Sequence, residues 1–383
     1  MKIKVLFFIS GITSGGIAKG LIPLVNSLSL DSDIDIDLLI GSGSNNVIVD
    51  NEILPKAFYL NRAKGFKNMS NLSRLKALKR LFSVFLDGEY NIVVSCGAYA
   101  RWLGPVMATL FRIRSIALEP VAFSPEHHIE GKVARKFFLL ASKLRFSLSD
   151  IISPISNSIG KEIIDLCGVK SRKIKKLFYW YDFNNIRLLS EEKVITTVLP
   201  LNCRNKLISV CRLVERKGLM DLIHAVKRLR DKGYDCGIVI VGDGPIRGKL
   251  EAEINNLGLA EYVKLTGYVK NPYWFMKKSD IFILNSEFEG TPTVIVEAMS
   301  LGLPVIATDC PSGVREMLDT EFGPAGRLVP MNDSQALDDS IVELMSFPQI
   351  TQDFSVITSK VLVQYANENV RNDWMDLLLN RAS

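Results

Sequence analysis

The stretch at residues 287–302, with the sequence EFEGTPTVIVEAMSLG, holds the residues best suited to chemistry in this chain. Thr291 followed by Pro292 is typical of a helix start. A helix that begins directly after an apolar strand presents free backbone N–H groups, which bind anions such as a diphosphate. Glu289 precedes this helix, and Glu297 lies five residues after Pro292, about 7.5 Å along the axis. A nucleotide sugar, with hydroxyl groups on both sides of a diphosphate, would meet both carboxylates.

Two cations follow the strand expected at 206–212. Arg212 and Lys217, within VCRLVERKG, would lie at the edge of the sheet where that strand ends. When a bond between a sugar and a diphosphate breaks, negative charge accumulates on the departing phosphate. Two fixed cations can stabilise that charge without a metal ion. The sequences GDGP, which contains Gly244, and GYV, which ends in Val269, close two further strands where the backbone can approach a ligand.

The elements that position these residues alternate between strands and helices. In the second half, strands are expected at 206–212, 237–241, 262–266, 281–285, 304–308 and 327–329, and helices at 219–229, 246–257, 273–278, 293–301, 314–318 and 335–345. The strands are continuous apolar runs, which is typical of a parallel sheet covered by helices on both faces.

The first half repeats this pattern more loosely, with strands expected at 4–9, 34–40, 91–96, 115–118 and 150–154 and a helix at 18–28. We therefore predict an α/β fold of two Rossmann-like, doubly wound domains that face each other across a cleft. Ligands of such sheets bind at the carboxyl ends of the strands. The expected domains are residues 1–182, which bind the acceptor, and 183–360, which bind the donor. They are joined near 181–200, and residues 361–383 are expected to form a helix that packs back on the first domain.

Composition is that of a two-domain globular protein, with 383 residues, 48% apolar and 23% charged. The six cysteines are scattered without a C-x-x-C pair, so we expect core residues in a reducing compartment rather than a disulfide framework. A transmembrane helix needs about 20 consecutive apolar residues, and none is expected here. The sequence therefore predicts a cytoplasmic protein that is soluble or at most peripheral.

Charge is divided unevenly along the chain. Residues 1–180 hold 25 Lys and Arg against 14 Asp and Glu, a net charge of +11, and the remainder has a net charge of −5. A basic first half would suit an anionic membrane, at its inner face, or an anionic acceptor. Ordinary solvated helix faces explain the same clusters equally well. Nucleic acid is not expected, because the basic clusters lack interleaved aromatic residues.

The run DSDIDID at residues 31–37 contains overlapping D-x-D patterns, which hold a metal in other sugar transferases. Its alternation with isoleucine instead indicates a strand whose acidic residues lie on a solvent-exposed face. We therefore expect no metal site there.

In combination, these sequences resemble the retaining glycosyltransferases of family 4, which have the GT-B fold. The matching pieces are SGG at 14–16, RLVERKG, VGDGP, GYV and EGTPTVIVEAMSLGLPVIATDCPSGVRE. They occur in order at natural spacings and cover the second half almost continuously. The first half is covered more weakly.

The resemblance implies roles for individual residues. The donor diphosphate would be bound by Arg212, Lys217 and the backbone at Gly16, Gly290, Thr291, Pro292 and Thr293. Glu297 would bind the ribose, Glu289 would lie near the transferred sugar, and the base would lie against the backbone at 268–269. Enzymes of this kind retain the anomeric configuration and need no divalent ion or other cofactor.

One feature departs from the family. Many relatives place a histidine after the fourth strand of the first half, near the reacting sugar. The corresponding sequence here, IALEPVAF at 116–123, contains none. Glu119 is the candidate for that place, and His127 or His128 could reach it from the following loop.

We therefore expect a metal-independent hexosyltransferase that moves a hexose or N-acetylhexosamine from a nucleotide sugar, UDP-linked rather than GDP-linked. The acceptor would be a glycan or a polyprenyl-linked sugar in cell-surface polysaccharide synthesis. Two alternatives stay open: a sugar-nucleotide epimerase of the same fold, and a non-catalytic partner subunit that binds the nucleotide. A dinucleotide-binding dehydrogenase is disfavoured, because GITSGG at 11–16 lacks the G-x-G-x-x-G spacing.

Overall fold

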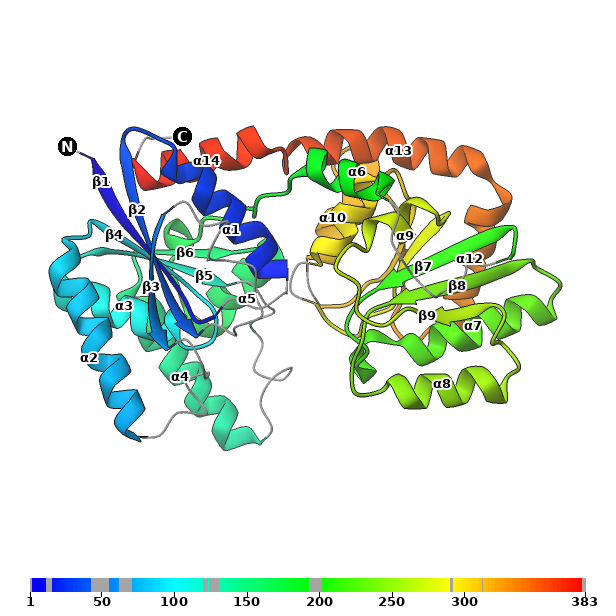
Figure 1. The fold of residues 1–383 in the computed structure, drawn as a ribbon, viewed down its shortest axis with the longest axis horizontal. Helices are drawn as coiled ribbons and strands as arrows, with labels where there is room; N and C mark the ends of the chain where they lie inside the picture. Colours follow the sequence, from blue (N-terminus) through cyan, green and yellow to red (C-terminus); the bar gives the residue numbers. More distant parts are fainter. Residues whose placement is uncertain are drawn as a thin grey trace. The chain divides into compact units, whose positions relative to one another are not determined.

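The computed structural model describes residues 2–11, 16–42, 55–61, 71–119, 123, 131–192, 202–289, 292–311 and 313–380. The chain divides into two compact units (Figure 1). Unit 1 comprises Met1–Tyr181 and Tyr365–Ser383, and unit 2 comprises Asp182–Gln364. Each unit is built around its own six-stranded sheet, in which every described strand pair is parallel.

Unit 1 alternates strands and helices as the sequence predicts. Its elements are β1 (Ile3–Ile9), α1 (Gly16–Ser29), β2 (Ile34–Ser42), β3 (Lys56–Asn61), α2 (Asn71–Gly88), β4 (Ile92–Cys96), α3 (Ala100–Phe111), β5 (Arg114–Glu119), α4 (Lys132–Leu148), β6 (Ile151–Pro154) and α5 (Asn157–Cys167), followed by a short 3₁₀ turn η3 (Ser171–Lys173). The strand order is β3-β2-β1-β4-β5-β6. This is the order of a dinucleotide-binding, Rossmann-like sheet.

The continuous apolar runs form strands because both sheet faces are covered. In β1, Val5 and Phe7 pack into one buried cluster with α1 and α5, whereas Leu6 and Phe8 pack into a second cluster with α2 and α3. A strand buried on both faces needs no alternation of apolar and polar residues.

The end of the chain returns to unit 1 as helix α14 (Asn367–Leu378). The Trp374 ring lies 5.9 Å from the Phe7 ring, and its indole Nε1 donates to the Phe178 carbonyl at 3.0 Å. Arg371 adds an ion pair with Asp31, with 2.7 Å between Nη2 and Oδ2. Of the segment 361–383 that the sequence predicts as one helix, residues 361–363 instead end helix α13 (Pro348–Val363) of unit 2.

Unit 2 begins with α6 (Phe183–Glu191), which lies in the segment expected to be a connection. The remaining elements are β7 (Asn205–Val210), η4 (Glu215–Lys217), α7 (Leu219–Asp231), β8 (Cys236–Val241), α8 (Arg247–Asn256), β9 (Val263–Leu265), α9 (Tyr273–Lys277), β10 (Ile281–Leu284), α10 (Thr293–Ser300), β11 (Val305–Thr308), α11 (Val314–Leu318), the hairpin β12 (Asp319–Thr320) and β13 (Gly323–Pro324), β14 (Arg327–Val329) and α12 (Ser334–Ser346). The order β14-β11-β10-β7-β8-β9 repeats the topology of unit 1.

Two further features differ from the sequence-based expectations. The strand β3 at the edge of unit 1 was not predicted, so the strand that ends at Glu119 is the fifth of the unit and not the fourth. Asp37 was expected on a solvent-exposed face, but it is buried and accepts a hydrogen bond from the Tyr90 hydroxyl at 2.6 Å. That bond satisfies the carboxylate inside unit 1.

All six cysteines lie within the described residues, and no disulfide joins any two of them; four are buried, and Cys203 and Cys211 are half-buried. Among the helices that the structure describes, none combines the length and apolarity needed to cross a membrane.

Candidate functional site

The predicted donor residues of unit 2 gather where the strand order of its sheet reverses. From β7 the chain proceeds to β8 and β9 on one side, and then to β10, β11 and β14 on the other. Ligands of doubly wound sheets bind at this point, because the loops after the two central strands part there. The loop after β7 carries Arg212 and Lys217, and the loop after β10 carries Glu289.

The two central loops are hydrogen-bonded to each other, once between their backbones and once through a side chain. The Glu287 amide donates to the Arg216 carbonyl at 2.8 Å, and the Asn285 side-chain amide donates to the Gly218 carbonyl at 3.0 Å. Gly218 has φ +58°, and a Cβ there would lie 2.2 Å from the Asn285 carbonyl oxygen. Only glycine combines this backbone conformation with so close an approach. The loops therefore form one fixed framework for the side chains they carry.

Lys217 and Glu289 form an ion pair within this framework, from the Lys217 ammonium to Oε1 of Glu289. The Ser286 hydroxyl donates to the same carboxylate oxygen at 2.7 Å. Each partner of the ion pair keeps 12% of its side chain exposed. The arrangement holds a cation and a carboxylate at fixed positions beside the switch point, in reach of a ligand and largely shielded from water.

Glu297 is the buried acid of the site. It lies on α10 with only 6% exposure, between buried neighbours Val296 and Ala298. Its partner is the Tyr273 side chain at the start of α9, to which it is hydrogen-bonded. Burial, and then the adjacent Glu297 carboxylate, raise the pKa of Tyr273 well above its usual range, so Tyr273 stays protonated and donates. A carboxylate buried in an apolar helix is costly unless its oxygens are bonded, and Tyr273 supplies one such bond.

Arg212 contrasts with Lys217, because its side chain is exposed and forms no ion pair with any other described residue. Its backbone is nevertheless fixed between its neighbours. The Leu213 amide donates to the Asp243 carbonyl at 3.0 Å, and the Val214 amide donates to the Arg212 carbonyl at 2.9 Å. A guanidinium that is carried on a fixed backbone and is not used in an ion pair can donate its N–H groups to an anionic oxygen of a ligand.

The glycines after β8 have a packing role that the sequence did not reveal. A Cβ at Gly242 would lie 1.9 Å from the Cys211 carbonyl oxygen, and a Cβ at Gly244 would lie 2.2 Å from that of Leu213. The Gly242 amide also donates to the Gly267 carbonyl at 3.0 Å, which joins the loops after β8 and β9. These glycines therefore allow backbone to approach backbone. Val269, the predicted neighbour of the base, is half-buried two residues further on.

The remaining predicted residues fall in different places. Pro292 is buried and caps α10, and Thr293 is the first residue of that helix. Gly290 and Thr291 lie outside the described residues. Gly16 belongs to unit 1, where it begins α1 after β1, the strand at which the order of that sheet reverses.

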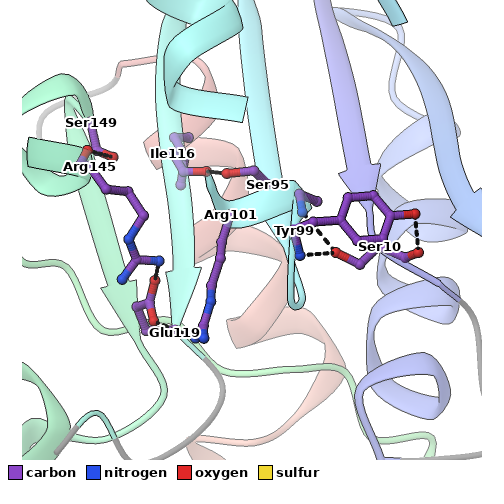
Figure 2. A network of polar contacts seen from close by, with 9 residues as sticks. Ser10, Ser95, Tyr99, Arg101, Ile116, Glu119, Arg145 and Ser149 are labelled. Carbon is purple, nitrogen blue, oxygen red and sulfur yellow. Dashed lines mark hydrogen bonds and ion pairs between the residues drawn. The ribbon is translucent and has the colours of Figure 1, made fainter. Parts of the chain in front are cut away.

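Ser10 ties together the two central loops of unit 1. Its hydroxyl oxygen accepts from the amides of Tyr99 at 2.9 Å and Ala100 at 2.8 Å, at the start of α3 (Figure 2). The Tyr99 hydroxyl donates in return to the Ser10 carbonyl at 2.6 Å.

Glu119, the candidate for the missing histidine, lies in a buried ion-pair network. Figure 2 shows Arg101 and Arg145 both reaching its carboxylate. The Arg101 contact measures 3.2 Å from Nη1 to Oε2, and the Glu119 side chain has no exposed area. The guanidinium carbon of Arg145 also lies 4.7 Å from the centre of the Trp102 ring and 4.2 Å from the centre of the Phe146 ring. Burial lowers the pKa of the Arg145 guanidinium, and the neighbouring Glu119 carboxylate opposes that shift.

This network gives both carboxylate oxygens of Glu119 a charged partner from unit 1 itself. Such a carboxylate is held in place and shielded from a substrate, so the geometry favours a structural role over the catalytic one implied by its position. His127 and His128, the other candidates, lie outside the described residues.

Comparison with known proteins identifies the family. The family model for glycosyl transferases group 1 matches residues 197–360, which correspond to most of unit 2. WcaL of Escherichia coli (strain K12), provisionally described as a colanic acid biosynthesis glycosyltransferase, is 32% identical over 333 residues. The match covers 81% of this chain and 75% of WcaL. The chain belongs to the glycosyl transferases group 1 family.

Two other relatives match over shorter stretches. An uncharacterized glycosyltransferase of Methanocaldococcus jannaschii is 36% identical over 211 residues, which is 53% of this chain and 50% of that protein. The N-acetylgalactosamine-N,N'-diacetylbacillosaminyl-diphospho-undecaprenol 4-alpha-N-acetylgalactosaminyltransferase of Campylobacter jejuni is 33% identical over 195 residues, 50% of each chain. The match therefore spans about half the length of each of these two relatives.

Solved structures confirm the GT-B fold. Anabaena Alr3699/HepE in complex with UDP superposes with a TM-score of 0.78 at 18% identity, covering 99% of this chain and 100% of that one. Sucrose-phosphate synthase from Thermosynechococcus elongatus gives 0.77 at 15% identity, covering 99% of each chain.

Sequence reasoning missed three residues that complete the site of this group 1 protein. Ser286 binds Glu289, Tyr273 binds Glu297, and Asn285 joins the two central loops. Ser286 and Asn285 follow an apolar strand directly, a position that could have marked them. Nothing in the sequence pairs Tyr273 with Glu297, because the contact is made between two different helices.

Proposed function

We propose that this protein transfers a hexose or N-acetylhexosamine from a nucleotide sugar to a glycan or polyprenyl-linked acceptor, with retention of the anomeric configuration and without a metal ion. The donor is UDP-linked, in keeping with the UDP bound in the Anabaena HepE structure. The acceptor class follows the names of the Campylobacter and Escherichia relatives, which concern an undecaprenyl-linked sugar and colanic acid. Assignment to family 4 rests on the motifs given above.

The observation that carries the proposal is the placement of Lys217 and Glu289 in contact at the switch point of unit 2. In the proposed complex the donor diphosphate lies at the start of α10, where the first backbone amides lack partners within the helix. Lys217 and Arg212 neutralise its oxygens, and Glu297 accepts from the ribose hydroxyls. Glu289 then faces the hydroxyl groups of the transferred sugar, held by Ser286 and by Lys217.

The chemistry needs stabilisation of the leaving group more than it needs a protein nucleophile. As the bond from the anomeric carbon to the phosphate oxygen breaks, the departing UDP gains negative charge. As the new bond to the anomeric carbon forms, the acceptor hydroxyl passes its proton to that departing phosphate oxygen. Fixed cations in a poorly hydrated site stabilise that charge without having to reorganise. Within this proposal unit 1 holds the acceptor and contacts the inner, cytoplasmic face of an anionic membrane, for which its excess of basic residues is suited.

Turnover with defined substrates tests the proposal. The protein is incubated in EDTA with UDP-glucose, UDP-galactose or their N-acetylated forms, with and without a polyprenyl-diphosphate-linked sugar. We expect release of UDP from one donor only when acceptor is present, and a product whose new linkage has the anomeric configuration of the donor by NMR. Interconversion of the UDP-sugars without acceptor would instead establish an epimerase, and a strict need for a divalent ion would overturn the metal-independent mechanism.

A further inference from the structure

Helix α4 of unit 1 turns a continuous apolar stripe to solvent. Val133, Phe137, Leu140 and Leu144 are 84, 72, 68 and 64% exposed. At about 100° per residue these four side chains lie within roughly 60° of one another around the helix. The core contacts of α4 are made on the opposite side, by Ser142, Arg145 and Phe146. The stripe is therefore not part of the interior of unit 1, and isolated exposed apolar residues do not account for it.

Positive charge follows one edge of the stripe. Lys132, Lys136 and Lys143 are all exposed, and helical geometry places the three on the same flank of the apolar residues. The helix carries five basic residues and no acidic one. A helix with an apolar face bordered by lysines has the composition of helices that lie in the interface of a membrane.

The neighbouring helix α2 repeats this composition. On α2, Leu75, Phe82 and Leu86 are exposed at helical spacing, and the helix carries four basic residues against a single acidic one. Helix α3, which packs against both α2 and α4 (Figure 1), adds the exposed apolar side chains of Val106 and Leu110. Exposed apolar side chains thus recur on three successive helices of unit 1, and on α2 and α4 they are accompanied by basic residues.

We propose that α4 is a membrane-docking helix, which inserts Val133, Phe137, Leu140 and Leu144 into the surface of a bilayer that contains anionic lipid. The apolar stripe would lie at the boundary between headgroups and acyl chains, and the lysine flank would lie among the headgroups. This inference deepens the proposed function, because a polyprenyl-linked acceptor is itself confined to a membrane.

A second copy of the chain fits this surface less well. A symmetric dimer through α4 would bring together two helices that each carry five basic residues and no acidic one, so no acidic residue of either helix could compensate the positive charge. Anionic headgroups supply the complementary charge, and acyl chains supply the complementary apolar layer.

Co-sedimentation with vesicles tests the proposal. We expect the protein to pellet with vesicles of phosphatidylcholine and phosphatidylglycerol, to pellet much less with phosphatidylcholine alone, and to be released partly by salt. The double variant Phe137→Ser/Leu140→Ser should lower the partition coefficient at least about tenfold, because both side chains leave the apolar layer. Its matched control is Leu188→Ser/Val356→Ser, which removes two comparably exposed apolar side chains from unit 2.

Charge is tested in the same assay. The triple variant Lys132→Gln/Lys136→Gln/Lys143→Gln should lose the preference for anionic vesicles. The triple variant Lys232→Gln/Lys278→Gln/Lys360→Gln, which neutralises three exposed lysines of unit 2, should keep it.

Three outcomes would overturn the docking helix: no pelleting of the wild type with anionic vesicles at low salt, stripe variants that pellet as the wild type does, or a dimer in sedimentation velocity that the stripe variant abolishes. Binding of UDP is measured on the same samples. Vesicle binding without UDP binding would reject the proposed function and keep the docking helix, and the reverse result would reject the docking helix alone.

Discussion

Replacement of Arg212 by alanine is expected to lower kcat for sugar transfer by about 100- to 1,000-fold, the usual effect of removing one preorganised group that stabilises transition-state charge. Because negative charge on the phosphate grows as the sugar leaves, the loss should appear mainly in kcat and less in KM. The free energy of unfolding should change little, since the Arg212 side chain is exposed and forms no ion pair with another described residue.

Arg204→Ala is the matched control for this variant. Arg204 is also exposed and lies just before β7, at the opposite end of the strand that leads to Arg212. We expect steady-state kinetics close to those of the wild type. If Arg212→Ala keeps its kcat, the departing phosphate is not stabilised at this place and the assignment of the loop after β7 is wrong.

Replacement of Glu119 by glutamine is expected to destabilise unit 1 by about 3–5 kcal/mol, because it removes the only carboxylate between Arg101 and Arg145 in the network that the structure describes. Most of this cost would come from Arg145, which would be left as a buried charge without a carboxylate partner, since its side chain is only 1% exposed. The Arg101 side chain is 20% exposed and can turn to water. Denaturant unfolding measures the change through the shift in midpoint.

A double variant separates a structural role of Glu119 from a catalytic one. In Glu119→Met/Arg145→Met the buried charges leave together, and apolar side chains of similar volume are often neutral for stability. We expect most of the stability and most of the sugar transfer to return. A double variant that is stable but inactive would show that Glu119 contacts the reaction, as its position in the sequence implies.

Much of unit 2 was predictable because its signals are local. Strands such as β8 and helices such as α7 were placed to within one or two residues, since their apolar runs and helical spacing leave little ambiguity. Strand β3 was missed because its apolar run, AFYL at 57–60, is only four residues long, and so short a run does not by itself distinguish a strand from a helix segment. Helix α6 was missed because it falls in a polar stretch between units, where the Asp182 side chain caps its first turn.

The site was predictable in its residues but not in its contacts. Motif spacing placed Lys217 and Glu289 after the two central strands, and the strand order then explains why they meet. The burial of Glu119 could not be foreseen, because its partners Arg101 and Arg145 come from helices on either side of β5 in the chain. Sequence alone does not show whether the last residue of a strand faces a ligand or a neighbouring helix.

Binding of a uridine nucleotide by unit 2, without metal, at Arg212, Lys217 and Glu297 is the basis of the proposed function. It is tested most directly by thermal unfolding in EDTA with UDP, GDP, NAD or 2′,3′-dideoxy-UDP, for the wild type and for Glu297→Ala. At 100 times its dissociation constant a ligand stabilises the folded state by about 2.7 kcal/mol, which is readily measured. We expect UDP to stabilise the wild type and dideoxy-UDP to stabilise it less. Glu297→Ala should be stabilised more weakly than the wild type, and equally by both ligands. Stabilisation by NAD alone, by none of the four, or by UDP equally in both proteins would contradict the proposed binding.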